Sequence, residues 1–370
     1  MEFNLSDNTT MVADTARRYL KDHYGFDTYM QQLNQLNHCD PSRWELMREL
    51  GWFGLPFPES VGGYGGDLID VAMIVREAGA VLCLDPYVDL VIGPGKLLEY
   101  LGTERALKVL QSIVDDDERV ACALYDYHAG YNILKPSLSI NSSKLSGRKN
   151  FVPDGGCANR VLTTAMLGDE LTLVLVPLED CEVTRYRGLD GSRLADVLFD
   201  DVVIDEEMIL SRGVKVERAV SKAVAWLQAL DCARMYGAAS ALYQRTLDYA
   251  KTRKQFGAPI GSFQVIQHYL VDMFTDLQQL ESMLFMVSVK ADLDDTLERE
   301  HACSTTKAYY ADKGVKIAQQ AIQIHGGIGV TEELDIGHYF RLMTHCSLTH
   351  GHGDYHLDRI AALGEECDRG

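Results

Sequence analysis

One stretch of the sequence, residues 216–251, contains no proline and repeats alanine, leucine and aromatic residues at helical spacing. This pattern predicts one long helix. Ser262 is expected to cap a second helix over about 263–293, and a third helix is expected over about 298–324. The glycine cluster at 326–329 ends the third helix. The last part of the chain is therefore predicted to be helical.

The first part of the chain also has a helical pattern. Asp40 and Pro41 form an N-cap and first-turn pair that opens a helix over 42–50. Thr103 is placed to cap a further helix over 104–114.

The middle of the chain has a different pattern. Residues 171–176 and 197–204 are short, rich in β-branched residues and bounded by glycine or proline, which predicts strands of a mostly antiparallel β-domain. The order helical, β, helical predicts a mostly α chain of the α+β class. The expected domains are a helical domain over 1–118, a β-sandwich or barrel over 119–214 and a helical bundle over 215–370.

Composition limits the partners of the protein. The chain has 370 residues with 35 Lys plus Arg and 54 Asp plus Glu, a formal net charge of −19. Such an acidic protein repels phosphate backbones and anionic lipids, so we expect neither nucleic acid nor membrane as a partner. The nine cysteines include no C-x-x-C pair, which indicates reduced thiols. With no signal-peptide pattern at the start and no apolar run near ~20 residues, we expect a cytoplasmic protein.

The first chemical motif is Arg253-Lys254-Gln255-Phe256-Gly257, followed by Ile260-Gly261-Ser262-Phe263-Gln264. A basic pair ends one helix, a turn follows, and a new helix starts. Free backbone N–H groups and a guanidinium together suit a pyrophosphate. The alternative is that the two cations only complement the dipole of the preceding helix.

The second motif is Gln323-Ile324-His325-Gly326-Gly327-Ile328-Gly329-Val330. Its glycines let the backbone approach a ligand closely, and the amide of Gln323 can bond to that ligand. The alternative is an ordinary glycine helix end.

These two motifs together resemble the paired flavin signature of the acyl-CoA dehydrogenase family. Three other segments match the family in order: 55–66 resembles its "G-L-P-x-E-x-G-G-x-G" loop, 146–156 its "G-x-K-x-W-I-T-N-G" segment, and 196–210 its "F-x-D-V-x-V-P" strand. The resemblance covers nearly the whole chain. It implies an FAD-dependent oxidoreductase that desaturates acyl-CoA thioesters, with a helical N-domain, a β middle domain and a C-terminal four-helix bundle.

In that family, FAD lies at a subunit interface. The resemblance implies that one set of residues contacts the neighbouring subunit's FAD, at its pyrophosphate or its adenine–ribose end. This set is Arg253, Gln255, Phe256, Gln264, Gln323, Gly326 and Gly327. Phe151 is the expected contact to the flavin ring.

The ring half of the site departs from the family pattern. The family's "T-E-P-x-x-G-S-D" loop corresponds to residues 124–131, where Tyr125 and Asp126 replace threonine and glutamate. Phe151-Val152-Pro153 replaces the W-I-T triplet, and proline offers neither an N–H nor a hydroxyl to the ring.

The family's base also departs. A carboxylate removes the α-proton of the thioester while the β-hydride passes to flavin. Matching Gly353 and Arg359 to the family's "Y-E-G-T-x-x-I-x-R" loop places His352 where glutamate belongs. An imidazole can act as a base. Asp354 is the alternative, and a third possibility is that the loop carries no base. Other members keep a base on the long helix, where Asp231 is the nearest carboxylate.

Several readings therefore stay open. The chain is an acyl-CoA dehydrogenase or its small subunit, a non-catalytic partner that completes another subunit's FAD site, or a related flavin monooxygenase or nitroalkane-oxidase-like enzyme with Asp354 as base. Expected partners are acyl-CoA, an electron-transfer flavoprotein or similar acceptor, and a second copy or an unlike dehydrogenase subunit. The spacing of His350, His352 and His356 is compatible with a metal, but no ligand set is completed, so we expect none.

Within the family, Gly337-His338-Tyr339-Phe340 and the His-rich loop are most similar to the small subunit of pimeloyl-CoA dehydrogenase. Heteromeric dehydrogenases of steroid side chains are the next resemblance.

Overall fold

The computed structural model describes residues 5–34, 40–115 and 118–369, with side chains up to residue 364. The chain forms two compact units. One contains residues 1–31, 68–83 and 228–370, and the other contains 32–67 and 84–227. We describe each unit by itself.

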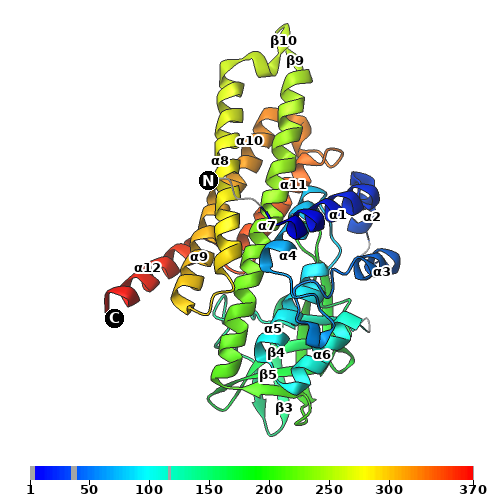
Figure 1. The fold of residues 1–370 in the computed structure, drawn as a ribbon, viewed down its shortest axis with the longest axis vertical. Helices are drawn as coiled ribbons and strands as arrows, with labels where there is room; N and C mark the ends of the chain where they lie inside the picture. Colours follow the sequence, from blue (N-terminus) through cyan, green and yellow to red (C-terminus); the bar gives the residue numbers. More distant parts are fainter. Residues whose placement is uncertain (1–4, 35–39, 116–117, 370) are drawn as a thin grey trace. The chain divides into compact units, whose positions relative to one another are not determined.

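The first unit is helical. It contains α1 (Asp7–His23), α4 (Leu68–Ala80), most of α7 (Val214–Thr252), α8 (Gln264–Lys290), α9 (Thr296–Tyr309), α10 (Val315–His325), α11 (Ile336–Leu348) and α12 (Gly353–Arg369). The two longest, α7 and α8, run side by side and are joined by the short strands β9 (Lys254–Gln255) and β10 (Ala258–Pro259) (Figure 1).

Close packing in this unit depends on small residues in α7. A Cβ on Gly237 would lie 1.8 Å from the carbonyl oxygen of Arg76, so only glycine lets α4 approach α7 this closely.

The second unit combines short helices with a sheet. Its helices are α3 (Pro41–Glu49), α5 (Gly93–Leu101) and α6 (Glu104–Asp115), and α2 (Phe26–Leu33) crosses from one unit to the other. Asp40 caps α3 by accepting from the backbone N–H groups of Ser42 and Arg43. The N–H of Ala106 donates to the hydroxyl of Thr103, as the sequence predicted for α6.

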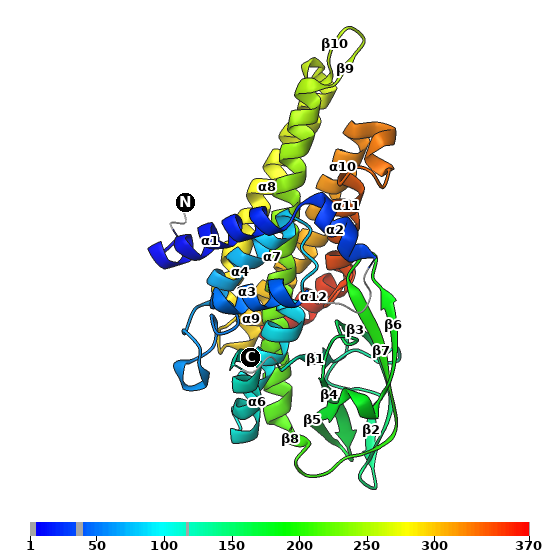
Figure 2. The ribbon, with the colours of Figure 1, turned by 90° about the vertical axis from the view of Figure 1, so that its right-hand side faces the viewer.

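The sheet has the strand order β6-β7-β3-β2-β4-β5-β8, and β1 pairs with β4 (Figure 2). The strands are β1 (Val120–Ala123), β2 (Ser139–Asn141), β3 (Lys144–Pro153), β4 (Arg160–Leu167), β5 (Glu170–Pro177), β6 (Glu182–Arg187), β7 (Arg193–Val203) and β8 (Ile209–Arg212). Most pairs are antiparallel, but β4 is parallel to both β1 and β2. The predicted fold class, mostly helical with a β part in the middle of the chain, is confirmed.

Two local predictions are wrong. Ser262 does not cap α8: its hydroxyl donates to the carbonyl of Pro259 at 2.7 Å, and α8 begins without a side-chain cap. The helix expected over 298–324 is interrupted by a π-turn at Tyr310–Gly314. A Cβ on Gly314 would lie 2.9 Å from the methyl carbon of Met235, and glycine relieves this crowding where α7 passes the turn.

Candidate functional site

The turn between α7 and α8 presents the first motif to solvent. Gln255 pairs with Ala258, so Phe256 and Gly257 form a two-residue turn in which both have positive φ, 53° and 82°. The N–H of Ile260 donates to the carbonyl of Arg253 at 2.8 Å and closes the turn at its base. The side chain of Phe256 is 94% exposed, and Arg253 and Gln255 are also exposed.

The start of α8 lies directly after this turn. The N–H of Ile266 donates to the Phe263 carbonyl at 3.0 Å, but α8 has no side-chain cap, so the N–H groups at its very start keep their capacity to bind an anion. Gln264 is the first residue of α8 and is exposed. An exposed guanidinium, an exposed glutamine and an uncapped helix start therefore lie in one short segment, which fits the pyrophosphate of FAD.

The second motif forms the end of α10 and the turn after it. Gly326 has φ 66° and ψ −146°, a conformation essentially limited to glycine. Apart from the neighbours in the chain, no atom of the described residues lies within 4 Å of the place where a Cβ on Gly326 or Gly327 would be, so the space beside this turn is open. Gln323 is exposed on the last turn of α10. The open turn leaves room for a ligand to contact the backbone.

Residues 124–131 of the second unit, which correspond to the family's flavin-ring loop, are called the ring-side loop. The side chain of Asp126 holds this loop in place. Asp126 accepts from the N–H groups of Ala129 and Ser137 at 2.8 and 3.0 Å and lies 3.6 Å from the buried Lys149. Burial lowers the pKa of Lys149 to about 8, although Asp126 opposes the shift. The buried ion pair of Asp126 and Lys149 thus helps to hold the ring-side loop in place.

The backbone donors next to this loop are also satisfied within the chain. The N–H of Tyr127 donates to the side-chain oxygen of Asn150 at 3.1 Å, and Asn150 in turn donates to Asp196 at 2.7 Å. The N–H of Phe151 donates to the Tyr186 hydroxyl at 3.1 Å and to Asp196 at 3.3 Å. The Phe151 side chain is 57% exposed, with φ 56°. The N–H groups of Tyr127 and Phe151 are therefore already bonded to side chains of this chain.

His352 caps α12. Its Nδ1 accepts a hydrogen bond from the N–H of Tyr355 at 3.1 Å. Because a backbone N–H can only donate, Nδ1 supplies the lone pair, and a neutral His352 carries its proton on Nε2. Asp354 is exposed in the first turn of α12. Both side chains therefore have the ordinary positions of residues at a helix start.

The loop before His352 is held by a buried polar network. Lys307 of α9, whose side chain is 1% exposed, donates to Asp231 at 3.0 Å and to the carbonyls of Cys346 and Thr349 at 2.6 and 2.7 Å. His350 donates through Nδ1 to the same oxygen of Asp231 at 2.9 Å. Burial opposes ionisation of Asp231, but the charges of Lys307 and His350 outweigh it and hold the pKa of Asp231 below its ordinary value.

The network joins residues that are far apart in the sequence and that no local pattern connects. The sequence indicates Asp231 only as the nearest carboxylate on the long helix, and it indicates no role for Lys307. What the sequence does show is one charged residue, Asp231 or Lys307, inside each of two apolar helical stretches. A charge inside a buried helix requires a partner.

His356 is buried next to Gly351 of this loop, and its pKa lies far below the ordinary value of a histidine. Burial and the charge of Lys307 lower its pKa to about 3. Its Nδ1 lies 3.3 Å from the Ser304 hydroxyl, and a Cβ on Gly351 would lie 2.4 Å from its Nε2. The folded chain therefore holds a neutral imidazole that fits only beside a glycine.

This lowered pKa predicts a pH dependence of stability. An unfolded histidine titrates near ~6.5, so between about pH 6.5 and 3 the unfolded chain binds the extra proton, and stability falls as the pH falls through that window. We expect His356→Phe to lose part of this dependence in urea unfolding at pH 7.5 and 5.0. The exposed His128→Gln is the control. Equal pH dependence in His356→Phe and wild type would contradict the assignment.

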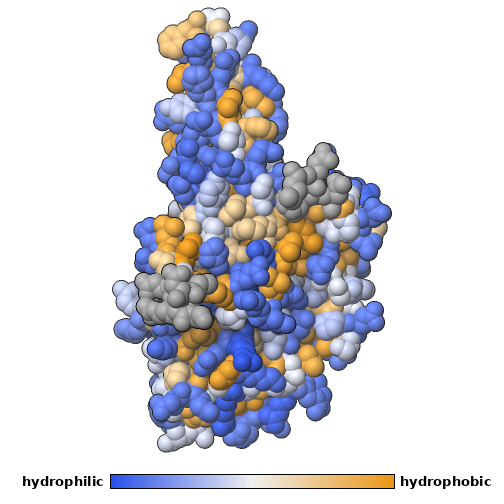
Figure 3. Space-filling model, turned by 60° about the vertical axis from the view of Figure 1, so that its left-hand side comes forward, coloured by the Kyte–Doolittle hydropathy of each residue, from blue (hydrophilic) through white to orange (hydrophobic). Residues whose placement is uncertain are grey.

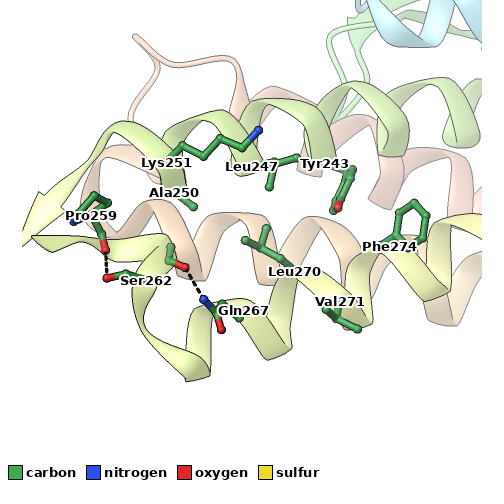
Figure 4. A pocket seen from close by; sticks show the side chains of 11 residues that line it. Tyr243, Leu247, Ala250, Lys251, Pro259, Ser262, Gln267, Leu270, Val271 and Phe274 are labelled. Atoms are coloured by element: carbon green, nitrogen blue, oxygen red, sulfur yellow. Dashed lines mark hydrogen bonds between the residues drawn. The ribbon is translucent and has the colours of Figure 1, made fainter.

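A groove lies between α7 and α8 near the turn. Its volume is about 580 Å³, and its lining includes Tyr243, Leu247, Leu270 and Phe274 (Figure 4). Figure 4 also shows the bond from Ser262 to Pro259 that replaces the predicted cap.

Exposed apolar side chains continue along α8. Val265 is 57% exposed, Val271 62% and Phe274 48%. Figure 3 shows hydrophobic residues among hydrophilic ones along the upper parts of α7 and α8. The α7–α8 hairpin therefore exposes several apolar side chains among polar ones (Figure 3).

Two other properties concern the whole described part of the chain. Among its residues, no group of three or more His, Cys, Asp or Glu is arranged to hold a metal ion. None of the helices in this described part is both long and apolar enough to cross a membrane.

Known proteins resemble this chain over most of its length. The model for "Acyl-CoA dehydrogenase, C-terminal domain" matches residues 218–363, and the one for the N-terminal domain matches 6–107. Probable acyl-CoA dehydrogenase YngJ from Bacillus subtilis is 27% identical over 92% of this chain and 93% of its own length. Caffeyl-CoA reductase-Etf complex subunit CarC from Acetobacterium woodii is 28% identical over 80% of this chain and 82% of its own.

A solved structure shows the same fold. The ChsE4-ChsE5 complex from Mycobacterium tuberculosis matches with a TM-score of 0.88 at 20% identity, over 99% of both chains. These matches define an oxidoreductase of the FAD-dependent class. The chain belongs to the acyl-CoA dehydrogenase family, whose enzymes act on the CH–CH bond of acyl-CoA thioesters.

Proposed function

We propose that this chain is the non-catalytic subunit of an acyl-CoA dehydrogenase built from unlike chains. In this assembly it holds the ADP half of the FAD whose flavin ring lies in its partner. The observation that carries the proposal is a contrast within the chain. The segments at 253–264 and 323–327 are exposed and open, whereas the donors beside the ring-side loop are bonded within the chain.

Each part of the FAD site has its own support. Arg253, Gln255 and the uncapped start of α8 at Gln264 would hold the pyrophosphate through charge-assisted and backbone hydrogen bonds. Gln323 and the open glycine turn would hold the adenine–ribose end. FAD supplies the acceptor for the hydride that leaves the β-carbon of the acyl chain. In our proposal the proton at the α-carbon is removed by the partner's glutamate.

The loop at residues 349–359, which corresponds to the family's glutamate loop, also supports a non-catalytic role for this chain. A working base needs a lone pair or an anionic oxygen with a pKa near the working pH. His352 uses its Nδ1 lone pair to cap α12, and Asp231 has a lowered pKa because Lys307 and His350 stabilise its anion. A carboxylate stabilised in this way is a weaker base than a free one.

The remaining partners follow from the family. The apolar groove and the exposed side chains of α8 suit packing against another helical subunit. One relative is named as part of a complex with Etf, and we propose an electron-transfer flavoprotein as the acceptor. The acidic composition and the lack of C-x-x-C spacing among the nine cysteines are consistent with a cytoplasmic protein.

The proposal is tested by variants of the loop. In an active assembly with an acyl-CoA dehydrogenase chain that carries the family glutamate, His352→Ala and Asp354→Asn should each leave acyl-CoA-dependent dye reduction within about twofold of wild type. Glutamate→Gln in the partner is the positive control and should abolish the reaction. Loss of turnover in His352→Ala or Asp354→Asn, with FAD content and folding unchanged, would show that this chain carries a working base.

A further inference from the structure

The two FAD-binding segments are joined by one face of α7. Arg245, Tyr249 and Arg253 are four residues apart, so they follow one another along the same face of the helix. The carbonyl of Tyr249 accepts from the N–H of Arg253 at 2.8 Å, which continues the helix to the turn. The position of Arg253 is thereby fixed to that of Tyr249.

Tyr249 also contacts the other segment. Its ring stacks on that of His325 with centroids 4.3 Å apart and an interplanar angle of 24°, and its hydroxyl donates to the His325 carbonyl at 3.5 Å. His325 is the last residue of α10 and is 6% exposed. It lies directly before the open turn at Gly326 and Gly327.

The His325 ring is itself fixed on two sides. Its Nδ1 lies 2.8 Å from the carbonyl of Ala321, and since a carbonyl can only accept, Nδ1 donates. A Cβ on Gly329 would lie 2.9 Å from the Cβ of His325, so the turn folds back onto this residue. Burial lowers the pKa of His325, which favours the neutral ring.

The far end of the segment is held by the same face of α7. Arg245 lies against Asp335 at 2.5 Å, and its guanidinium is 5.2 Å from the centroid of the Tyr339 ring. Residues 326–335 are thus attached to α7 at both ends, by Tyr249 at the start and by Arg245 at the finish.

We propose that Tyr249, acting through His325, is a positioning residue for FAD: it fixes the turn at 323–327 relative to Arg253 so that one FAD can contact both segments. The proposal rests on the proposed FAD placement. Aromatic pairs contribute ~0.5–1.5 kcal/mol beyond their buried area, so loss of the stack should weaken FAD binding about twofold to twelvefold.

The test is FAD titration of the flavin-free assembly. Tyr249→Leu should raise the Kd for FAD about twofold to twelvefold, and Tyr249→Phe should leave it near the wild-type value because it keeps the stack. Tyr19→Leu is the matched control, since it also removes a Tyr–His ring contact, that of Tyr19 with His23 on α1 at 4.7 Å between centroids, outside both segments. We expect its Kd to equal that of wild type.

A second measurement needs no flavin. In the chain alone, hydrogen exchange of the Gly326 and Gly327 amides should be faster in Tyr249→Leu than in wild type, with α8 amides unchanged. If Tyr249→Leu does not fold, His325→Leu removes the same stack from the other side and should give the same two results.

The outcomes separate this inference from the proposed function. If Arg253→Ala weakens FAD binding and Tyr249→Leu does not, Tyr249 has no positioning role and only this inference fails. If neither variant changes the Kd, the FAD placement itself is wrong.

Discussion

Lys307→Met should destabilise the helical unit more than any other single change considered for this chain. The variant removes a buried cation that donates to Asp231 and to the carbonyls of Cys346 and Thr349. Breaking a buried ion pair from one side costs about 3–5 kcal/mol, because the remaining charge and acceptors stay buried. We expect a loss of this size in the free energy of unfolding from urea titration at pH 7.5.

The chain offers a matched control in Lys108→Met. Lys108 forms an ion pair with Glu104 on the surface, with 72% and 84% of the two side chains exposed. Exposed pairs of this kind contribute little to stability because solvent screens them, so Lys108→Met should be close to wild type. Adding Asp231→Asn to Lys307→Met should recover part of the loss, because it removes the unpaired charge. A Lys307→Met variant as stable as Lys108→Met would contradict the network.

Arg253→Ala should give the largest loss of FAD binding. The guanidinium is exposed at the end of α7, next to the uncapped start of α8. A charge-assisted hydrogen bond to a phosphate contributes ~1.5–3 kcal/mol, which corresponds to a Kd about 10- to 150-fold higher. The measurement is FAD retention during gel filtration of the assembly, followed by titration with FAD.

Lys254→Ala is the control for this variant. Lys254 is the next residue, is also exposed and has the same charge. If the site depended only on the general positive charge of the turn, both variants would lose FAD to the same extent. Retention of flavin by Arg253→Ala at the wild-type level would show that the pyrophosphate lies elsewhere.

The arrangement of helices and strands could be predicted from local signals. The long helix over 216–251 lacks proline, and the observed α7 extends only a residue or two beyond each end. Asp40 and Thr103 cap helices as predicted because an N-cap needs only a short polar side chain and the next turn. The predicted cap by Ser262 is wrong because its hydroxyl donates to the nearby carbonyl of Pro259, a bond that competes with capping.

The candidate site was less predictable, for a physical reason. Glycine turns and exposed cations are visible in the sequence because their spacing is local. The bonds from Phe151 to Tyr186 and Asp196, and from Lys307 to Asp231, join residues far apart in the chain, and their existence depends on tertiary packing. Tyr249 carried no signal at all, since an aromatic residue on a long helix usually belongs to the core.

The most direct test of the whole account is a count of flavin and turnover per chain. This chain and a glutamate-bearing acyl-CoA dehydrogenase chain are co-expressed and purified together, and FAD is measured against the amount of each chain. We predict one FAD for each pair of unlike chains, with acyl-CoA-dependent turnover that this chain does not show alone. A fully active homo-oligomer of this chain with one FAD per chain would contradict the account.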